Sequence, residues 1–211
     1  MGKNSASTNS KREQAQAMVA NQQKKAKRTR LVTIGVAAAA ALAIAVPTAV
    51  VLTGEANQRA ALSAAAEQPI EGVQVYGNLT SNHVEEDVDY PQHPGVGGDH
   101  YPIWANCGVY NKEITETHAV HSLEHGAVWI TYRSDISDGE KAALEDLVGD
   151  RTYMLLSPYD EQEEPIKLSA WGVQLAVDTA SDPRIATFIT KYRQGDQTPE
   201  PGAACTGGLD G

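Results

Sequence analysis

The fold of this chain is decided at residues 114–132, which read ITETHAVHSLEHGAVWITY. Residues 114–124 predict a short helix that ends at Gly126, because glycine suits the position just beyond a helix terminus. Residues 127–132 are β-branched and aromatic, a composition that is typical of a strand. The segment therefore predicts a helix followed almost at once by a strand.

Further elements are predicted on both sides of this segment. Ser137 followed by Glu140 is the signature of a helix start, and Asp182-Pro183 begins a last helix. Residues 90–103 are so rich in proline and glycine that they form either an ordered loop or no structure. Strands are predicted at residues 73–76, 152–156 and 166–171. This order favours a single α+β domain in which helices pack on a mainly antiparallel sheet.

The histidines give the sharpest functional signal. All six lie between His83 and His125, and imidazole is a common ligand of zinc and copper. His121 and His125 are four residues apart, so on a helix they share one face. Further ligands must come from distant residues, and His83 and His100 are the best candidates. The sequence predicts a copper or zinc site, and the alternative is a metal-free cluster of hydrogen-bonded histidines.

Glu124 has two candidate roles in such a site. His121-Ser-Leu-Glu124-His125 matches the inverted zinc-protease pattern, in which the glutamate activates water. A zinc peptidase needs a third acidic ligand, for which Glu140 and Glu145 are candidates. Otherwise Glu124 orients an imidazole from outside the ligand set. Whether the protein is an enzyme stays open. Met154 is a candidate soft ligand if the ion is copper.

The N-terminal part predicts a membrane protein with one span. Residues 1–30 hold eight basic residues and one acidic residue and predict a disordered cytoplasmic tail. Residues 31–53 carry no charge and are long enough for a transmembrane helix. Residues 54–69 predict a helical stalk, and residues 70–211 predict an extracytoplasmic domain, because the basic flank stays in the cytoplasm. A cleaved secretory signal is the alternative.

Charge and cysteine content agree with an exterior domain. The chain has a net charge of −10 and its first 30 residues carry +7, so the remainder carries −17. This excess argues against a nucleic-acid partner, whose phosphates need basic residues. Cys107 and Cys205 predict one disulfide in an oxidising compartment, closing a loop of 98 residues. Such a loop is worth roughly 4 to 5 kcal/mol. The alternative for Cys107 is a thiolate metal ligand.

Several motifs carry a resemblance to a known family. They are residues 96–100 (VGGDH), 104–110 (WANCGVY), 119–132 (AVHSLEHGAVWITY), 155–159 (LLSPY), 169–172 (SAWG) and 199–205 (PEPGAAC). With them, the chain over about residues 70–208 resembles the bacterial domain of unknown function 3105 family, which is common in actinobacteria. The resemblance implies a single-span or secreted protein without an assigned reaction. It favours His83, His100, His121 and His125 as site residues over His93 and His118.

The resemblance leaves two classes of function open. One is transition-metal binding through the histidine cluster. The other is a metal-free interaction or accessory subunit of a cell-envelope or respiratory membrane complex. Metal content separates the two.

Overall fold

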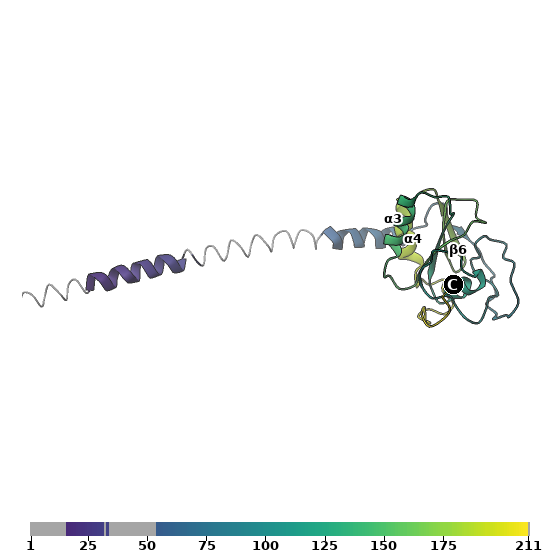
Figure 1. The fold of residues 1–211 in the computed structure, drawn as a ribbon, viewed down its shortest axis with the longest axis horizontal. Helices are drawn as coiled ribbons and strands as arrows, with labels where there is room; N and C mark the ends of the chain where they lie inside the picture. Colours follow the sequence, from purple (N-terminus) through teal and green to yellow (C-terminus); the bar gives the residue numbers. More distant parts are fainter. Residues whose placement is uncertain (1–15, 32, 34–53, 211) are drawn as a thin grey trace, which may run out of the picture. The chain divides into compact units, whose positions relative to one another are not determined.

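The structure, a computed structural model, describes residues 16–31, 33 and 54–210. Contacts divide the chain into two units, Met1–Gln58 and Arg59–Gly211. Residues 16–31 and 54–66 are helical (Figure 1). Most of the predicted transmembrane helix, residues 34–53, lies outside the described residues. Within the described part, no helix is both long enough and apolar enough to cross a bilayer.

The unit Arg59–Gly211 is built on one six-stranded sheet with the strand order β1-β6-β5-β3-β4-β2. The strands are β1 Gln74–Val75, β2 Gly108–Val109, β3 Val128–Tyr132, β4 Met154–Pro158, β5 Ile166–Ala170 and β6 Val173–Val177. β3 pairs antiparallel with β5 but parallel with β4, and β4 pairs parallel with β2. The sheet is therefore mixed, which corrects the predicted mainly antiparallel sheet. A helix joins β3 to β4, and such a crossover returns the chain in the same direction.

Beyond the helical residues 59–66, the described part of this unit contains α2 Glu116–Glu124, α3 Asp138–Val148 and α4 Pro183–Tyr192. The predicted start of α3 is confirmed, because the Ser137 hydroxyl accepts the Glu140 amide at 3.2 Å. The predicted start of α4 is confirmed in the same way, because the Asp182 carboxylate accepts the Arg184 amide at 2.8 Å. Pro183 fills the first turn, where its missing N–H costs nothing.

The two faces of the sheet carry separate hydrophobic cores. Side chains alternate between faces along a strand, so Ile130 and Trp129 of β3 enter different cores. On one face, Leu144 of α3 and Phe188 of α4 share a buried core with Ile130. Both helices are labelled in Figure 1. On the other face, α2 packs with Trp129, together with long loops and the C-terminal residues. This second face positions the histidines.

Residues 90–103 form an ordered loop on this second face, so the first of the two predicted alternatives holds. The Gly95 amide donates to the Glu116 carboxylate of α2 at 2.6 Å. The Gln174 amide of β6 donates to the carbonyl of Pro94 at 2.9 Å. Burial raises the pKa of Glu116 above its ordinary value. The loop is therefore held by a helix and a strand in addition to the hydrogen bonds within it.

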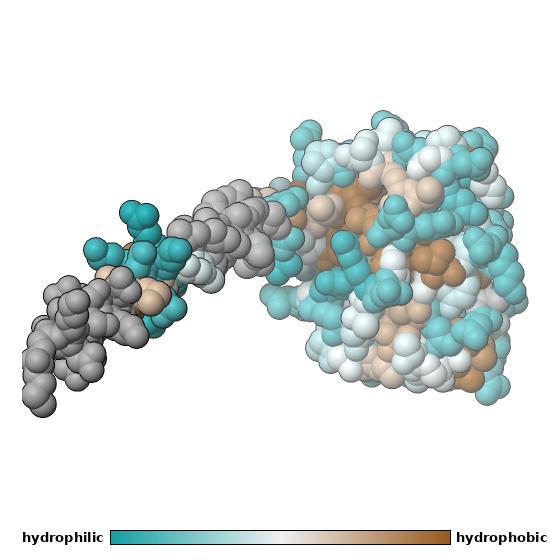
Figure 2. Space-filling view, turned by 60° about the vertical axis from the view of Figure 1, so that its left-hand side comes forward, coloured by the Kyte–Doolittle hydropathy of each residue, from teal (hydrophilic) through white to brown (hydrophobic). Residues whose placement is uncertain are grey.

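The surface of this unit is mostly hydrophilic in the view of Figure 2, with apolar side chains in scattered patches between polar ones. That distribution fits the acidic composition of the chain beyond residue 30. Large apolar side chains with high exposure include Val75 at 75% and Ile103 at 46%. Scattered exposed apolar residues of this kind are ordinary for a folded domain.

Candidate metal centre

Helix α2 turns polar side chains toward the interior. His121 and Glu124 are only 2% and 3% exposed, although Leu123 of the same helix packs in the apolar core. The helix ends at Glu124 with His125 as its cap, and Gly126 follows with a φ of +98° that favours glycine. The amide of Gln194 also occupies the space that a Cβ of this residue would need. The chain then enters β3 directly, so His121 and Glu124 are fixed against the sheet.

Two further histidines come from segments that precede α2. His83 and His100 form an isolated parallel β-bridge. The Val84 amide donates to the His100 carbonyl at 2.8 Å, and the His100 amide donates to the Asn82 carbonyl at 3.0 Å. Because the bridge joins the two backbones, both rings arrive at the same place. His100 is fully buried, whereas the His83 side chain is 46% exposed.

Four side chains meet at one point. Each of His83, His100, His121 and Glu124 offers a ligand atom, and these atoms lie within 4.8 Å of one another. Glu124 Oε2 is 3.0 Å from His100 Nε2 and 3.6 Å from His83 Nε2. Two donors on a tetrahedral zinc ion, each about 2.1 Å from the metal, are about 3.4 Å apart. The separations of these atoms therefore bracket the spacing that such an ion needs.

The hydrogen bonds of the buried rings leave their Nε2 atoms free to act as ligands. His100 Nδ1 lies 2.7 Å from the Gly98 carbonyl, His121 Nδ1 lies 2.6 Å from the Tyr101 carbonyl, and His125 Nδ1 lies 2.6 Å from the Ala204 carbonyl. A carbonyl oxygen only accepts, so each Nδ1 carries the hydrogen. In a neutral ring the Nε2 atom then presents a lone pair. Anchoring of one ring nitrogen to orient the other is the usual arrangement for metal-binding histidines.

This arrangement brings acceptor atoms face to face. His121 Nε2 lies 2.9 Å from His125 Nε2, and His100 Nε2 lies 3.0 Å from Glu124 Oε2. With every Nδ1 atom already donating, two lone pairs in contact repel each other. Each contact therefore needs a positive charge between its atoms, either a proton on a ring or a metal ion. A metal held by the grouped residues would take the place of the proton between His100 and Glu124, whereas His125 lies outside that group.

The electrostatics of His121 favour its neutral form. Burial is the main cause that lowers its pKa from 6.5 to about 4, and the neighbouring rings of His100, His125 and His83 add to the effect. The hydrogen bond to the Tyr101 carbonyl acts in the opposite direction. A neutral imidazole is the form that ligates metals, so His121 is ready to bind at neutral pH.

The structure sorts the remaining predicted residues. His125 caps α2 and touches His121, but the four-membered group contains Glu124 where the sequence predicts His125. His118 lies apart, donating to the Ile103 carbonyl. His93 also lies apart, with its Nδ1 atom 3.3 Å from the Tyr159 hydroxyl. The resemblance had favoured the other four histidines over these two.

Three candidate ligands from the sequence lie on the opposite face of the sheet. Met154 is fully buried in the core beneath α3 and α4, so the hypothesis of a thioether ligand is wrong. Glu140 and Glu145 belong to α3, where Glu140 accepts the Ala180 amide and Glu145 pairs with Lys141 at 3.9 Å. The inverted protease pattern therefore lacks the acidic third ligand that these residues were to supply.

The cysteines lie at disulfide distance, with Cα atoms 5.4 Å apart. Their bridge joins Cys107, next to β2, to Cys205, which follows Ala204 directly. The Cys107 amide donates to the Cys205 carbonyl at 2.7 Å. The C-terminal residues are thereby held where the Ala204 carbonyl can orient His125. No spacing in the sequence signals this contact, because it uses a backbone atom 79 residues away.

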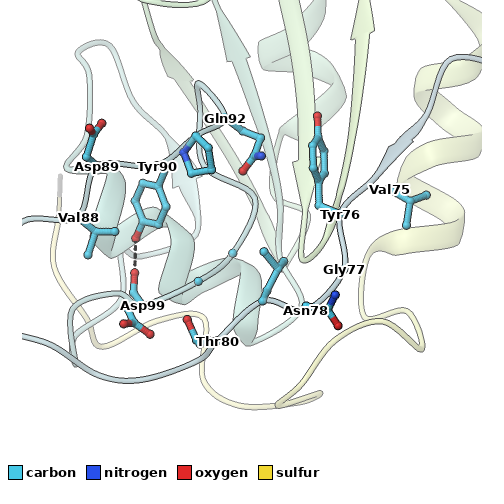
Figure 3. A pocket seen from close by; sticks show the side chains of 14 residues that line it. Val75, Tyr76, Gly77, Asn78, Thr80, Val88, Asp89, Tyr90, Gln92 and Asp99 are labelled. Carbon is cyan, nitrogen blue, oxygen red and sulfur yellow. Dashed lines mark hydrogen bonds between the residues drawn. The ribbon is translucent and has the colours of Figure 1, made fainter.

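A cavity of about 580 Å³ lies beside the loop that carries His100 (Figure 3). Its wall includes Tyr90, whose hydroxyl donates to the Asp99 carbonyl at 2.7 Å, as the dashed line shows. Burial raises the pKa of Tyr90 far above its ordinary value, so the hydroxyl stays a donor. The four grouped side chains do not line this cavity. The hydrogen bond from Tyr90 in the cavity wall holds Asp99, and so it supports the loop from Gly98 to His100.

Fold and site together define an α+β domain with a buried cluster of histidines and one glutamate on one face of a mixed sheet. Residues 83–207 match the model of a family described as protein of unknown function (DUF3105). The match covers more than half of the chain, and the chain belongs to this family. No curated protein and no solved structure matches it.

Proposed function

We propose that this protein binds a transition-metal ion through His83, His100, His121 and Glu124. The observation that carries the proposal is the convergence of anchored rings on a buried carboxylate. Two of the three rings in the group donate Nδ1–H to backbone carbonyls and aim Nε2 inward. A proton on His100 would make its contact with Glu124 an ion pair, whereas a bound metal would take the place of that proton and be held by both atoms.

The donor set favours zinc. Three imidazoles and a carboxylate match the ligands that Zn²⁺ takes in proteins, and they also suit Cu²⁺. Soft sulfur donors select Cu⁺, but Met154 lies on the other face and both cysteines are bridged. Copper in its reduced form is therefore a poor fit to this group.

The exposure of His83 favours a metal-handling role over catalysis. Three members of the group are almost fully buried, whereas the His83 side chain is 46% exposed. An ion can thus enter and leave by displacing one ligand at the surface. The peptidase hypothesis loses support, because its proposed acidic ligands lie across the sheet.

The first expected result is binding of about one equivalent of Zn²⁺ by the purified full-length protein. Binding should weaken at low pH, because ligation requires unprotonated imidazole. Burial lowers the pKa of His121 to about 4, so this ring should stay available as a ligand until the pH approaches that value. Isothermal titration with Zn²⁺ at a series of pH values measures both quantities. Cu²⁺ serves as the competing ion in a second titration.

A protein that ignores both ions at pH 7.5 would contradict the proposal. That result would favour the alternative function, a metal-free interaction subunit of an envelope or respiratory complex.

The variant Glu124→Gln tests the role of the carboxylate, because the amide keeps the shape of the side chain but removes the charge. We expect this variant to bind zinc more weakly and with less dependence on ionic strength.

We also propose that the chain is anchored in the cell membrane with its N-terminus in the cytoplasm and residues 70–211 outside. The support is the basic flank before residue 31 and the uncharged run of residues 31–53. A periplasmic-type reporter fused to the C-terminal end should be active. A tag at the N-terminus should stay with the membrane fraction. Loss of that tag would instead indicate a cleaved signal.

A further inference from the structure

The bridge between Cys107 and Cys205 borders a second cavity, of about 530 Å³, that is separate from the metal centre. Both cysteines line this cavity, together with Arg151 and Asp150. Cys205 is only 7% exposed, whereas Cys107 is half-buried. Cys107 is the less buried of the two cysteines, so an incoming thiolate would reach its side of the bridge first, through the cavity that Arg151 and Asp150 also line.

The C-terminal segment that this bridge holds makes three contacts with His125 and Glu124. The Ala204 carbonyl accepts the Nδ1 hydrogen of His125 at 2.6 Å. The Glu200 amide donates to the carbonyl of Glu124 at 3.0 Å. The Glu200 carboxylate also lies 3.8 Å from His125 Nε2. The segment therefore orients His125, which in turn contacts His121.

We infer that the Cys107–Cys205 bridge is a site of thiol–disulfide exchange with an external dithiol, and that its redox state sets the affinity of the metal centre. The second half of this inference rests on the proposed metal-binding function. The bridge holds Ala204 in place, Ala204 holds His125, and His125 meets His121. Opening the bridge removes the covalent link and leaves the segment held by hydrogen bonds, such as that from the Cys107 amide to the Cys205 carbonyl, and by the packing of Cys205 in the core.

The exchange proceeds in two displacements. One thiolate of the dithiol attacks Cys107 Sγ, the bond between the two cysteines breaks, and Cys205 leaves as a thiolate that takes up a proton. The second thiol of the reagent then attacks its own sulfur in the mixed disulfide. Cys107 leaves and takes up a proton, and the dithiol ends as a disulfide. Two electrons and two protons have passed from the dithiol to the protein.

The test compares zinc affinity before and after reduction of the full-length protein. Dithiothreitol is the first probe, and a peptide with a Cys-x-x-Cys sequence is the second. Maleimide labelling counts free thiols, and the reagent is removed without air before Zn²⁺ is titrated against a coloured chelator. We expect no label before reduction, two labels afterwards, and affinity about 10- to 100-fold weaker, the usual cost of losing a partner that orients a ligand. Exchange with the peptide shows that the cavity admits a protein thiol, whereas exchange with dithiothreitol alone limits it to small dithiols.

Two variants make the test specific. Cys107→Ser with Cys205→Ser should show the weaker affinity without any reductant. His125→Ala should bind zinc equally well in both redox states, because the coupling passes through that ring. An equal loss on reduction in wild type and His125→Ala would overturn the coupling. So would unchanged affinity in fully reduced wild type.

The thiol count also separates this inference from the proposed function. A bridge that resists both dithiols in the folded protein would overturn the exchange site, whatever the metal titration gives. An oxidised protein that binds no zinc would instead defeat the proposed function and, with it, the coupling.

Discussion

Replacing His121 with alanine is expected to weaken zinc binding by more than about 100-fold, since even partners outside the ligand set are worth 10- to 100-fold. His121 is 2% exposed, and its Nδ1 atom is anchored to the Tyr101 carbonyl. Solvent or a neighbouring side chain would have to move into that space to replace it. Competition titration with a chelator of known affinity measures the change.

His118→Ala is the matched control for this experiment. His118 lies on the same helix, three residues earlier, but donates to the Ile103 carbonyl and has no place in the grouped ligands. The affinity of the His118→Ala variant for zinc should stay within about twofold of wild type. Equal affinity in His121→Ala and wild type, with a native circular dichroism spectrum, would remove His121 from the site.

Replacing Trp129 with alanine is expected to lower the free energy of unfolding by about 3 to 5 kcal/mol. The Trp129 side chain is fully buried in the core beneath α2, and its indole N–H donates to the Ser157 hydroxyl at 2.9 Å. The substitution leaves a large cavity and a hydroxyl without its partner. Urea denaturation monitored by far-ultraviolet circular dichroism measures the difference.

Val75→Ala serves as the control for stability. The Val75 side chain is 75% exposed at the edge strand β1, so its loss should change the free energy of unfolding by less than about 0.5 kcal/mol. If the two variants unfold at the same urea concentration, Trp129 does not support the core as the packing indicates.

Signals that lie close together in the sequence predicted their elements well. Ser137 and Asp182 were recognised as helix starts because a cap is formed by residues two or three apart. The strand expected at residues 152–156 begins later, at Met154, because Tyr153 has a φ of +56°. A residue in that left-handed region cannot continue a strand.

Elements that depend on distant pairing were harder to predict. Strand β6 was missed, although Val173, Leu175 and Val177 alternate with smaller or polar residues. It follows β5 after a turn at Gly172, whose φ is +70°, and the predicted strand ended at Trp171, just before that glycine, with no second strand expected beyond it. The parallel pairing of β3 with β4 has no local signature. It is decided by the packing of α3 on the sheet.

In the candidate site, too, local signals were predictable from the sequence, whereas contacts between distant residues were not. The shared face of a helix could suggest His121 with His125, and the Pro/Gly-rich loop could suggest His100. Glu124 was considered only as a base or as an outer partner, yet its carboxylate lies between the rings of His83 and His100. Backbone carbonyls orient the buried rings, and sequence patterns do not reveal where a carbonyl points.

The contact between His125 and Ala204 has a consequence for biosynthesis. The candidate ligands lie within a stretch of 43 residues, from His83 to His125, but the atom that orients His125 is 79 residues further along the chain. A ribosome that has just finished the last histidine has therefore not yet made the group that aims it. Because contacts so distant in sequence form late in folding, the partner that orients His125 is in place only once the chain is nearly complete.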